Sequence, residues 1–170
     1  MKYFLTLGFL AMLVVSCAAA PKLQFPSASS DAEREVLAEM ARFYDKHFLH
    51  LDYEGMHEFY TPDAVIDSEY RRPIDPLELE RIKKYQYKKM RANGVYYRIT
   101  IEKIKTLTPD LVFVRCKHKV VFRNNMSGEN IRLFIWVRTQ AGWKIIWHAP
   151  YLPDEGDQDI IPALLKSYYS

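Results

Sequence analysis

The apolar residues that follow Ser30 recur with the period of a helix. Ser30 with Glu33 three residues later forms a capping box, the signature of a helix start. Apolar, aromatic and histidine side chains then fall on one face: Val36, Leu37, Met40, Phe43, Tyr44, His47, Phe48 and Leu51. This pattern predicts an amphipathic helix from residue 31 to about residue 49.

Two further helices and a brief strand are predicted before residue 95. Residues 52–60 indicate a short second helix that Pro62 ends, and residues 64–66 indicate a first, brief strand. Asp75 as the cap, Pro76 at the first position and Glu78 closing the box then predict a third helix that ends near residues 93–94.

After Gly94 the pattern changes from helical to alternating. It predicts strands over residues 95–105, 111–123, 130–138 and 143–149. The spacers between them are short and rich in turn-forming residues, which favours an antiparallel meander.

The alternation also predicts which side chains face the interior. In the second of these strands, one face carries Val112, Val114, Cys116, His118, Val120 and Phe122, and we expect it to point inward. By the same reasoning Phe134, Trp136 and Ile146 are expected on the outer face of the sheet. Large rings there predict an interface that a second copy of the chain covers.

The N-terminal residues indicate export rather than folded structure. Residues 3–15 form an apolar run too short to span a bilayer, and Val14-Val15-Ser16-Cys17 resembles a bacterial lipobox with Cys17 as the acylated residue. The predicted order is a signal peptide over 1–17, a flexible tether over 18–29, one domain over 30–150 and a C-terminal tail over 151–170. The predicted location is membrane-anchored outside the cytoplasm; ordinary cleavage after Ala19 or Ala20, giving a soluble secreted protein, is the alternative.

Composition narrows the class of partner. With 170 residues the chain suits one domain, and 24 basic against 21 acidic residues give a mixed surface that does not favour nucleic acid. Twelve tyrosines suit a pocket or interface lined by partly polar rings. Cys116 has no disulfide partner once Cys17 is acylated or removed.

The chain resembles the nuclear transport factor two-like superfamily in the order of its predicted elements and in two motifs. The order is a helix, a short helix, a third helix and four strands. The motifs are Phe59-Tyr-Thr-Pro-Asp-Ala-Val, before the third helix, and Gly142-Trp-Lys-Ile-Ile-Trp-His, in the last strand. The superfamily includes SnoaL-like cyclases and ketosteroid isomerases. The resemblance implies an α+β cone, in which a curved, mostly antiparallel sheet wraps around the long N-terminal helix. In the isomerases a tyrosine of the first helix and an aspartate after the Asp-Ala pair carry the chemistry; Tyr44 matches the tyrosine, but Ser68 stands at the aspartate.

Three residues remain candidates for catalysis: Tyr44, Asp67 and His118. Asp67 lies beside the missing base, but a one-residue shift on a strand turns it to the other face unless a bulge intervenes. No cofactor is predicted, because the chain lacks a Gly-rich phosphate loop. No metal is predicted either, since neither a cysteine nor a close set of carboxylates completes a site around His47 and His50.

The leading hypothesis is therefore a non-catalytic domain that binds a small apolar or aromatic ligand, or a protein partner, and forms a homodimer. We expect the pocket to be lined by Tyr44, Phe48, Val114, Cys116, His118 and Trp147. The alternatives are a dehydratase, isomerase or cyclase that uses the three candidate residues, and an accessory subunit of an envelope assembly.

Overall fold

The computed structural model describes residues 22–67, 72–123 and 127–151. The helical elements are α1 (Asp31–Tyr44), a π-helical turn η1 (Asp45–Leu49), a 3₁₀ turn η2 (Met56–Phe59) and α2 (Pro76–Ala92). The strands are β1 (Lys22–Gln24), β2 (Tyr60–Asp67), β3 (Pro73–Ile74), β4 (Tyr96–Thr108), β5 (Leu111–Val121), β6 (Ser127–Thr139) and β7 (Gly142–Tyr151). None of the helices in these ranges is long and apolar enough to cross a bilayer.

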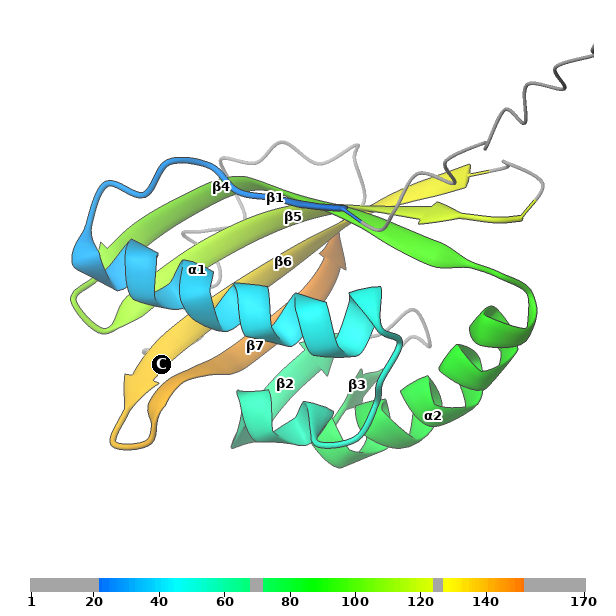
Figure 1. Cartoon of the computed structure of the whole chain (residues 1–170). Coiled ribbons are helices and arrows are strands. Elements are labelled where there is room, and N and C mark those ends of the chain that lie inside the picture. Colours follow the sequence, from blue (N-terminus) through cyan, green and yellow to red (C-terminus); the bar gives the residue numbers. More distant parts are fainter. Residues whose placement is uncertain (1–21, 68–71, 124–126, 152–170) are drawn as a thin grey trace, which may run out of the picture.

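The strands form one sheet in the order β1-β4-β5-β6-β7-β2-β3. The predicted meander is confirmed, because β4 to β7 pair antiparallel in sequence order. Among the strands that the structure describes, β1 pairs with β4 and β2 pairs with β7 in the parallel direction. Figure 1 shows α1 lying across the concave face of the sheet, while α2 runs beside β2 and β3. This α+β cone is the predicted fold class.

The helix signals placed most elements correctly. Ser30 and Asp75 cap α1 and α2, each accepting a hydrogen bond from the backbone N–H three residues on. Together α1 and η1 cover the predicted 31–49 helix. The predicted second helix shrinks to the four residues of η2, because β2 begins at Tyr60 and runs through Pro62.

The segment predicted as a flexible tether contains a strand. Residues 22–24 form β1, and Leu23 pairs with Ile99 of β4. The domain therefore begins eight residues before the predicted boundary at residue 30. The predicted signal peptide over residues 1–17 lies outside the described part of the chain, and so does the predicted tail over 151–170 except for Tyr151, which ends β7.

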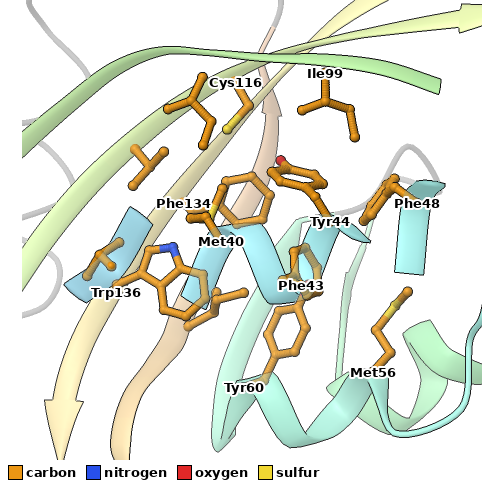
Figure 2. Close-up of a cluster of buried hydrophobic side chains, with 14 of the residues drawn as sticks. Met40, Phe43, Tyr44, Phe48, Met56, Tyr60, Ile99, Cys116, Phe134 and Trp136 are labelled. Atoms are coloured by element: carbon orange, nitrogen blue, oxygen red, sulfur yellow. The ribbon is translucent and has the colours of Figure 1, made fainter. Parts of the chain in front are cut away.

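The core fills the space between α1 and the concave face. Figure 2 shows the rings of Phe43, Tyr44 and Phe134 packed together with Trp136 and Met40. Phe134 and Trp136 have no exposed surface, so the prediction that they form an outward dimer face is wrong. Cross-strand pairing explains why both side chains point inward. Phe134 is paired with Val114, and residues that are paired directly across two strands share a face of the sheet. The inward direction of Val114 was predicted correctly from the sequence.

A second, smaller cluster lies on the opposite face of the sheet. It consists of Leu111, Phe113, Leu133 and Ile135, with Ile146 and Trp147 packed against it. These four side chains are at most 6% exposed in the single chain. Phe122, also predicted to point inward, lies one residue beyond β5 and is 43% exposed.

Candidate functional site

The domain contains a partly open cavity between α2, η1, β2 and the concave face of β4 to β7. Its volume is about 220 Å³. Much of the wall is apolar and comes from Phe43, Phe48, Met56, Ile66, Ile74, Leu79 and Ile82. The polar part comes from Tyr60, Asp67, Lys83, Gln86, Tyr97, His118, Asn130, Arg132 and His148. The wall is thus somewhat more polar than apolar, and a concave site that combines apolar side chains with convergent polar groups suits a small molecule.

His118 reaches the cavity from β5, as the alternation predicted. Its Nε2 lies 2.7 Å from the hydroxyl oxygen of Tyr44. Burial lowers the pKa of His118 well below its ordinary value, and the positive charge of Arg132 lowers it further. The imidazole is therefore neutral at pH 7, held between the rings of Tyr44 and Phe48.

Three of the predicted lining residues lie one layer behind the wall. Tyr44, Val114 and Cys116 are fully buried in the core and do not line the cavity. Burial raises the pKa of Tyr44 well above its ordinary value and that of the Cys116 thiol to about 12. Both groups stay protonated at pH 7, so Cys116 is a small buried core residue rather than a nucleophile.

Trp147 was predicted to line the pocket and lies on the other face of the sheet. The pairing of β6 with β7 slips between Ile135–Trp147 and Trp136–Ile145, which leaves Ile146 as an extra residue. This bulge places both Ile146 and Trp147 in the outer cluster. It also turns His148 inward, where it lines the cavity.

His148 is the polar residue that strand alternation could not assign. Its ring stacks on Phe134 with centroids 4.3 Å apart, and its Nδ1 lies 3.0 Å from the hydroxyl oxygen of Tyr60. The ring is 6% exposed, and its Nε2 has no hydrogen-bond partner among the residues that the structure describes. Burial, with the charge of Arg132, lowers its pKa well below the ordinary value.

Asp67 lines the same cavity, but its carboxylate is engaged. Its Oδ2 accepts a hydrogen bond of 3.1 Å from the indole Nε1 of Trp147. Two of the three catalytic candidates, Asp67 and His118, thus share one cavity, and Tyr44 touches it only through His118. Ser68, the position of the isomerase base in the resemblance, lies outside the described residues.

The remaining histidines serve the local structure of the N-terminal half. His47 Nδ1 bonds the carbonyl of Asp52, His50 Nδ1 bonds the carbonyl of Asp45, and His57 Nδ1 lies 2.6 Å from the carboxylate of Glu80. Within the described ranges no three histidine, cysteine or carboxylate side chains converge as a metal site would require.

The sequence contains signals that could have assigned the other polar lining residues to the cavity. Asn130 is paired with His118, and Arg132 with Cys116, so both share the inward face of the sheet. Lys83 and Gln86 are one helical turn apart on α2. The charge of Arg132 marked its face as solvent-facing by sequence, yet that face turns into the cavity.

Comparison with known proteins supports the fold alone. No family model and no curated protein sequence matches the chain. Among solved structures it resembles a Nostoc punctiforme domain of unknown function with a cystatin-like fold (TM-score 0.59, 10% identity, covering 82% of this chain and 88% of that one). It also resembles a nuclear transport factor two-like protein of Novosphingobium aromaticivorans (0.58, 16%, 75% and 86%) and a ketosteroid isomerase-like protein of Erwinia carotovora (0.53, 18%, 73% and 99%). The chain has the nuclear transport factor two-like cone fold.

Proposed function

We propose that the domain binds a small molecule with an apolar body in the cavity beneath α2, without transforming it. The observation that carries this proposal is the cavity itself, whose wall sets Phe48, Ile66 and Leu79 beside several polar side chains. A ligand whose apolar body covers these three side chains removes their apolar surface from water.

The cavity volume sets the size of the ligand. A cavity of about 220 Å³ lies below the roughly 300–1,000 Å³ of sites that hold drug-sized ligands. We therefore expect a ligand smaller than a drug-sized molecule, on the order of ten non-hydrogen atoms.

Thermal unfolding of the full chain with a panel of aromatic and branched aliphatic compounds of this size tests the proposal. A compound at ten times its Kd adds about 1.4 kcal/mol to the free energy of unfolding. For a chain of this length this corresponds to an increase in Tm of about 3–6 °C.

Two variants of α2 show whether binding occurs in the cavity. Leu79 lines the cavity, whereas Leu77, two residues away, is 52% exposed. Leu79→Trp fills the cavity and should abolish the ligand-induced increase in Tm. Leu77→Trp adds the same ring outside it and should leave that increase unchanged. If no compound of the panel raises Tm, or if Leu79→Trp responds like Leu77→Trp, the cavity is not a binding site.

Proton transfer at the same cavity is a second candidate function. It is supported by the neutral His118 of the cavity wall and by Asp67, which lines the same cavity although its carboxylate accepts the indole N–H of Trp147 from the other face of the sheet. A bound ketone incubated in heavy water should then exchange its α-protons, and Asp67→Asn should slow this exchange at least tenfold. Exchange at the uncatalysed rate leaves binding as the function of the cavity.

Export with a lipid on Cys17 is a separate proposal. It is supported by the lipobox-like residues 14–17 that follow the apolar run. The intact mass of the mature protein from its native host should show a diacylglycerol on an N-terminal Cys17. A mass that begins at residue 20 or 21 without lipid would indicate ordinary signal cleavage.

Homodimerisation also stays a proposal, but it loses the surface that motivated it. Phe134 and Trp136 are core residues, and Ile146 belongs to the outer cluster, whose central side chains are buried in the single chain. Light scattering at high micromolar concentration distinguishes the dimer from a monomer.

A further inference from the structure

The convex face of the sheet, opposite α1, carries an apolar cluster that no described helix covers. Its central side chains, Leu111, Phe113, Leu133 and Ile135, are between 3% and 6% exposed. The partly buried side chains packed against them, such as Trp147, come from strands of the same sheet. Figure 1 shows α1 across the other face and α2 beside β2 and β3, so neither helix lies over this outer cluster.

The burial of the outer cluster requires a cover from the chain itself. Side chains on an uncovered sheet face point into solvent and keep much of their surface exposed. Lys105 behaves in this way, because it is paired with Phe113 on the same face and is exposed. Phe113 is 4% exposed in the single chain. Another segment of the same chain must therefore lie over Phe113 and its apolar neighbours.

Four stretches lie outside the described residues, and their positions along the chain distinguish them. Residues 68–71 join β2 to β3 at the far edge of the sheet. Residues 124–126 join β5 to β6 at the end away from Leu111. Residues 1–21 precede β1 at the opposite edge, and most of them belong to the predicted signal peptide. Residues 152–170, here named the C-terminal segment, continue directly from β7, whose Trp147 borders the cluster.

The convex face is basic beside the outer cluster. Ion pairs with two glutamates engage three of its cations, and the side chains of this network are Arg115, Lys117, Lys119, Glu102 and Glu129. Lys103 and Lys105 of β4 are exposed and make no ion pair with a carboxylate that the structure describes. Positive charge is therefore in excess on this part of the face, and it attracts an acidic segment.

The C-terminal segment has its acidic and apolar residues in the order that this face requires. Tyr151 at the end of β7 is paired with Ile131, which is paired with Lys117, so the chain leaves the sheet beside the basic side chains. Acidic residues come first in the segment, at Asp154, Glu155, Asp157 and Asp159. Apolar residues follow, at Ile160, Ile161, Leu164 and Leu165.

The length of the segment also suits the face. Along β6, six residue steps separate Ile131 from Val137, at the far end of the cluster, which is about 20 Å. Nine extended steps from Tyr151 to Ile160 reach up to about 30 Å. The apolar part of the segment can therefore reach every part of the outer cluster.

We propose that the C-terminal segment covers the convex face, with its acidic part on the basic side chains and its apolar part on the outer cluster. The segment then competes with a second copy of the chain for this face, because removing it exposes an apolar patch of the kind that dimer interfaces cover. This inference is independent of the ligand proposed for the cavity.

Carbodiimide crosslinking of the full chain tests the contact directly, because it joins a carboxylate to an ammonium only where the two touch. We expect the acidic residues of the segment to be joined to Lys103 or Lys105, as identified by peptide mass. Lys84 and Lys88 of α2 are also exposed and provide the control. They should be joined at least tenfold less often. In a mixture of isotope-labelled and unlabelled chains, both halves of each joined peptide should come from the same chain.

Two matched pairs of substitutions test the apolar part. Leu164→Asp with Leu165→Asp places two charges among the apolar residues, whereas Ser167→Asp with Ser170→Asp adds the same charges at polar positions. We expect the leucine pair to raise the fluorescence of an anilinonaphthalene sulfonate dye at least threefold and to form dimers in light scattering. The serine pair should behave like the unchanged chain. A chain that ends at Tyr151 should behave like the leucine pair.

The outcomes decide which occupant covers the face. Links made mainly to α2, or no links at all, overturn the proposal. Links between differently labelled chains show that the segment of a second copy covers the face instead. Equal dye fluorescence in the leucine and serine pairs shows that the apolar part does not lie on the cluster. Crosslinking uses the unchanged chain, so it remains decisive even where a variant fails to fold.

Discussion

At the residue scale, Glu33 shows how one side chain joins a helix start to the sheet. Its carboxylate accepts the backbone N–H and hydroxyl of Ser29, each at 2.7 Å, and the backbone N–H of Thr106 at 3.0 Å. The hydrogen bonds from Ser29, with those from Thr106, lower the pKa of Glu33 to about 2 despite its burial. The predicted capping box is thus present with a difference, because Glu33 bonds Ser29 and β4 rather than the N–H of Ser30.

Replacing Glu33 with glutamine should destabilise the fold at neutral pH. Glu33 has a folded-state pKa below its ordinary value of 4.5, so its contribution is complete above that value and is lost as pH falls toward 2. We expect Glu33→Gln to lower the free energy of unfolding by about 2–3 kcal/mol at pH 7, measured by urea denaturation.

Glu39 on the same helix provides the control. It is paired with Arg42 in an exposed ion pair, so Glu39→Gln should change stability by less than about 1 kcal/mol. Equal losses in the two variants would contradict the role assigned to the bonds between Glu33 and Ser29 and Thr106.

At the element scale, signals in the sequence located the two α-helices and the four long strands, but they assigned some side chains of β6 and β7 to the wrong face of the sheet. Capping residues, turn spacers and alternation are local signals, and these predicted α1, α2 and the meander from β4 to β7. The direction of β6 depends on its pairing with β5, and that of Trp147 and His148 on a bulge in β7. Neither is a local property, so Phe134, Trp136 and Trp147 were assigned to the wrong surroundings.

The β7 bulge makes a testable prediction. Deleting Ile146 removes the extra residue and leaves Ile145, Trp147 and His148 paired with Trp136, Ile135 and Phe134, so each of these side chains keeps its face of the sheet. The deletion should therefore cost no more than about 1–3 kcal/mol of unfolding free energy. Ile146→Val keeps the bulge and should cost about 1 kcal/mol. Urea denaturation followed by tryptophan fluorescence measures both, and a much larger loss on deletion would show that the pairing on either side of the bulge is not kept.

At the scale of the whole molecule, the cone encloses two neutral histidines whose burial links stability to pH. The pKa values of His118 and His148 lie well below the ordinary 6.5, so the folded state resists protonation that the unfolded chain accepts. The stabilisation that depends on these two neutral rings is therefore fully present above about pH 6.5, and it decreases as pH falls. At pH 5 each histidine should reduce the free energy of unfolding by about 2 kcal/mol.

Urea denaturation between pH 7 and pH 5 checks this slope. His148→Phe should remove part of the decrease, because His118 and the buried His47, whose pKa burial also lowers, still contribute. His50 is exposed, and its Nδ1 lies near both the carbonyl and the carboxylate of Asp45; because its ring is not buried, His50→Phe should change the slope much less than His148→Phe. A wild-type stability that is flat from pH 7 to pH 5 would contradict the neutral buried state of both rings.

The same scale explains how much of the site could be predicted. His118 and Phe48 follow from alternation and helix period, and both line the cavity. Arg132 and Lys83 carry charges that ordinarily mark a solvated face, and only the closure of α2 over the sheet turns them toward one enclosed space. The convergence of β5, β6, β7 and α2 is a tertiary property that no single segment of the sequence contains.

The short strand β1 limits how a lipidated form of the chain would sit on a membrane. Only four residues separate Cys17 from Lys22. Five steps along a fully extended chain reach at most about 18 Å. An acyl group on Cys17 would therefore hold the edge of the sheet formed by β1 and β4 close to the bilayer surface. The opposite edge, where β3 follows β2, would then face away from the lipid.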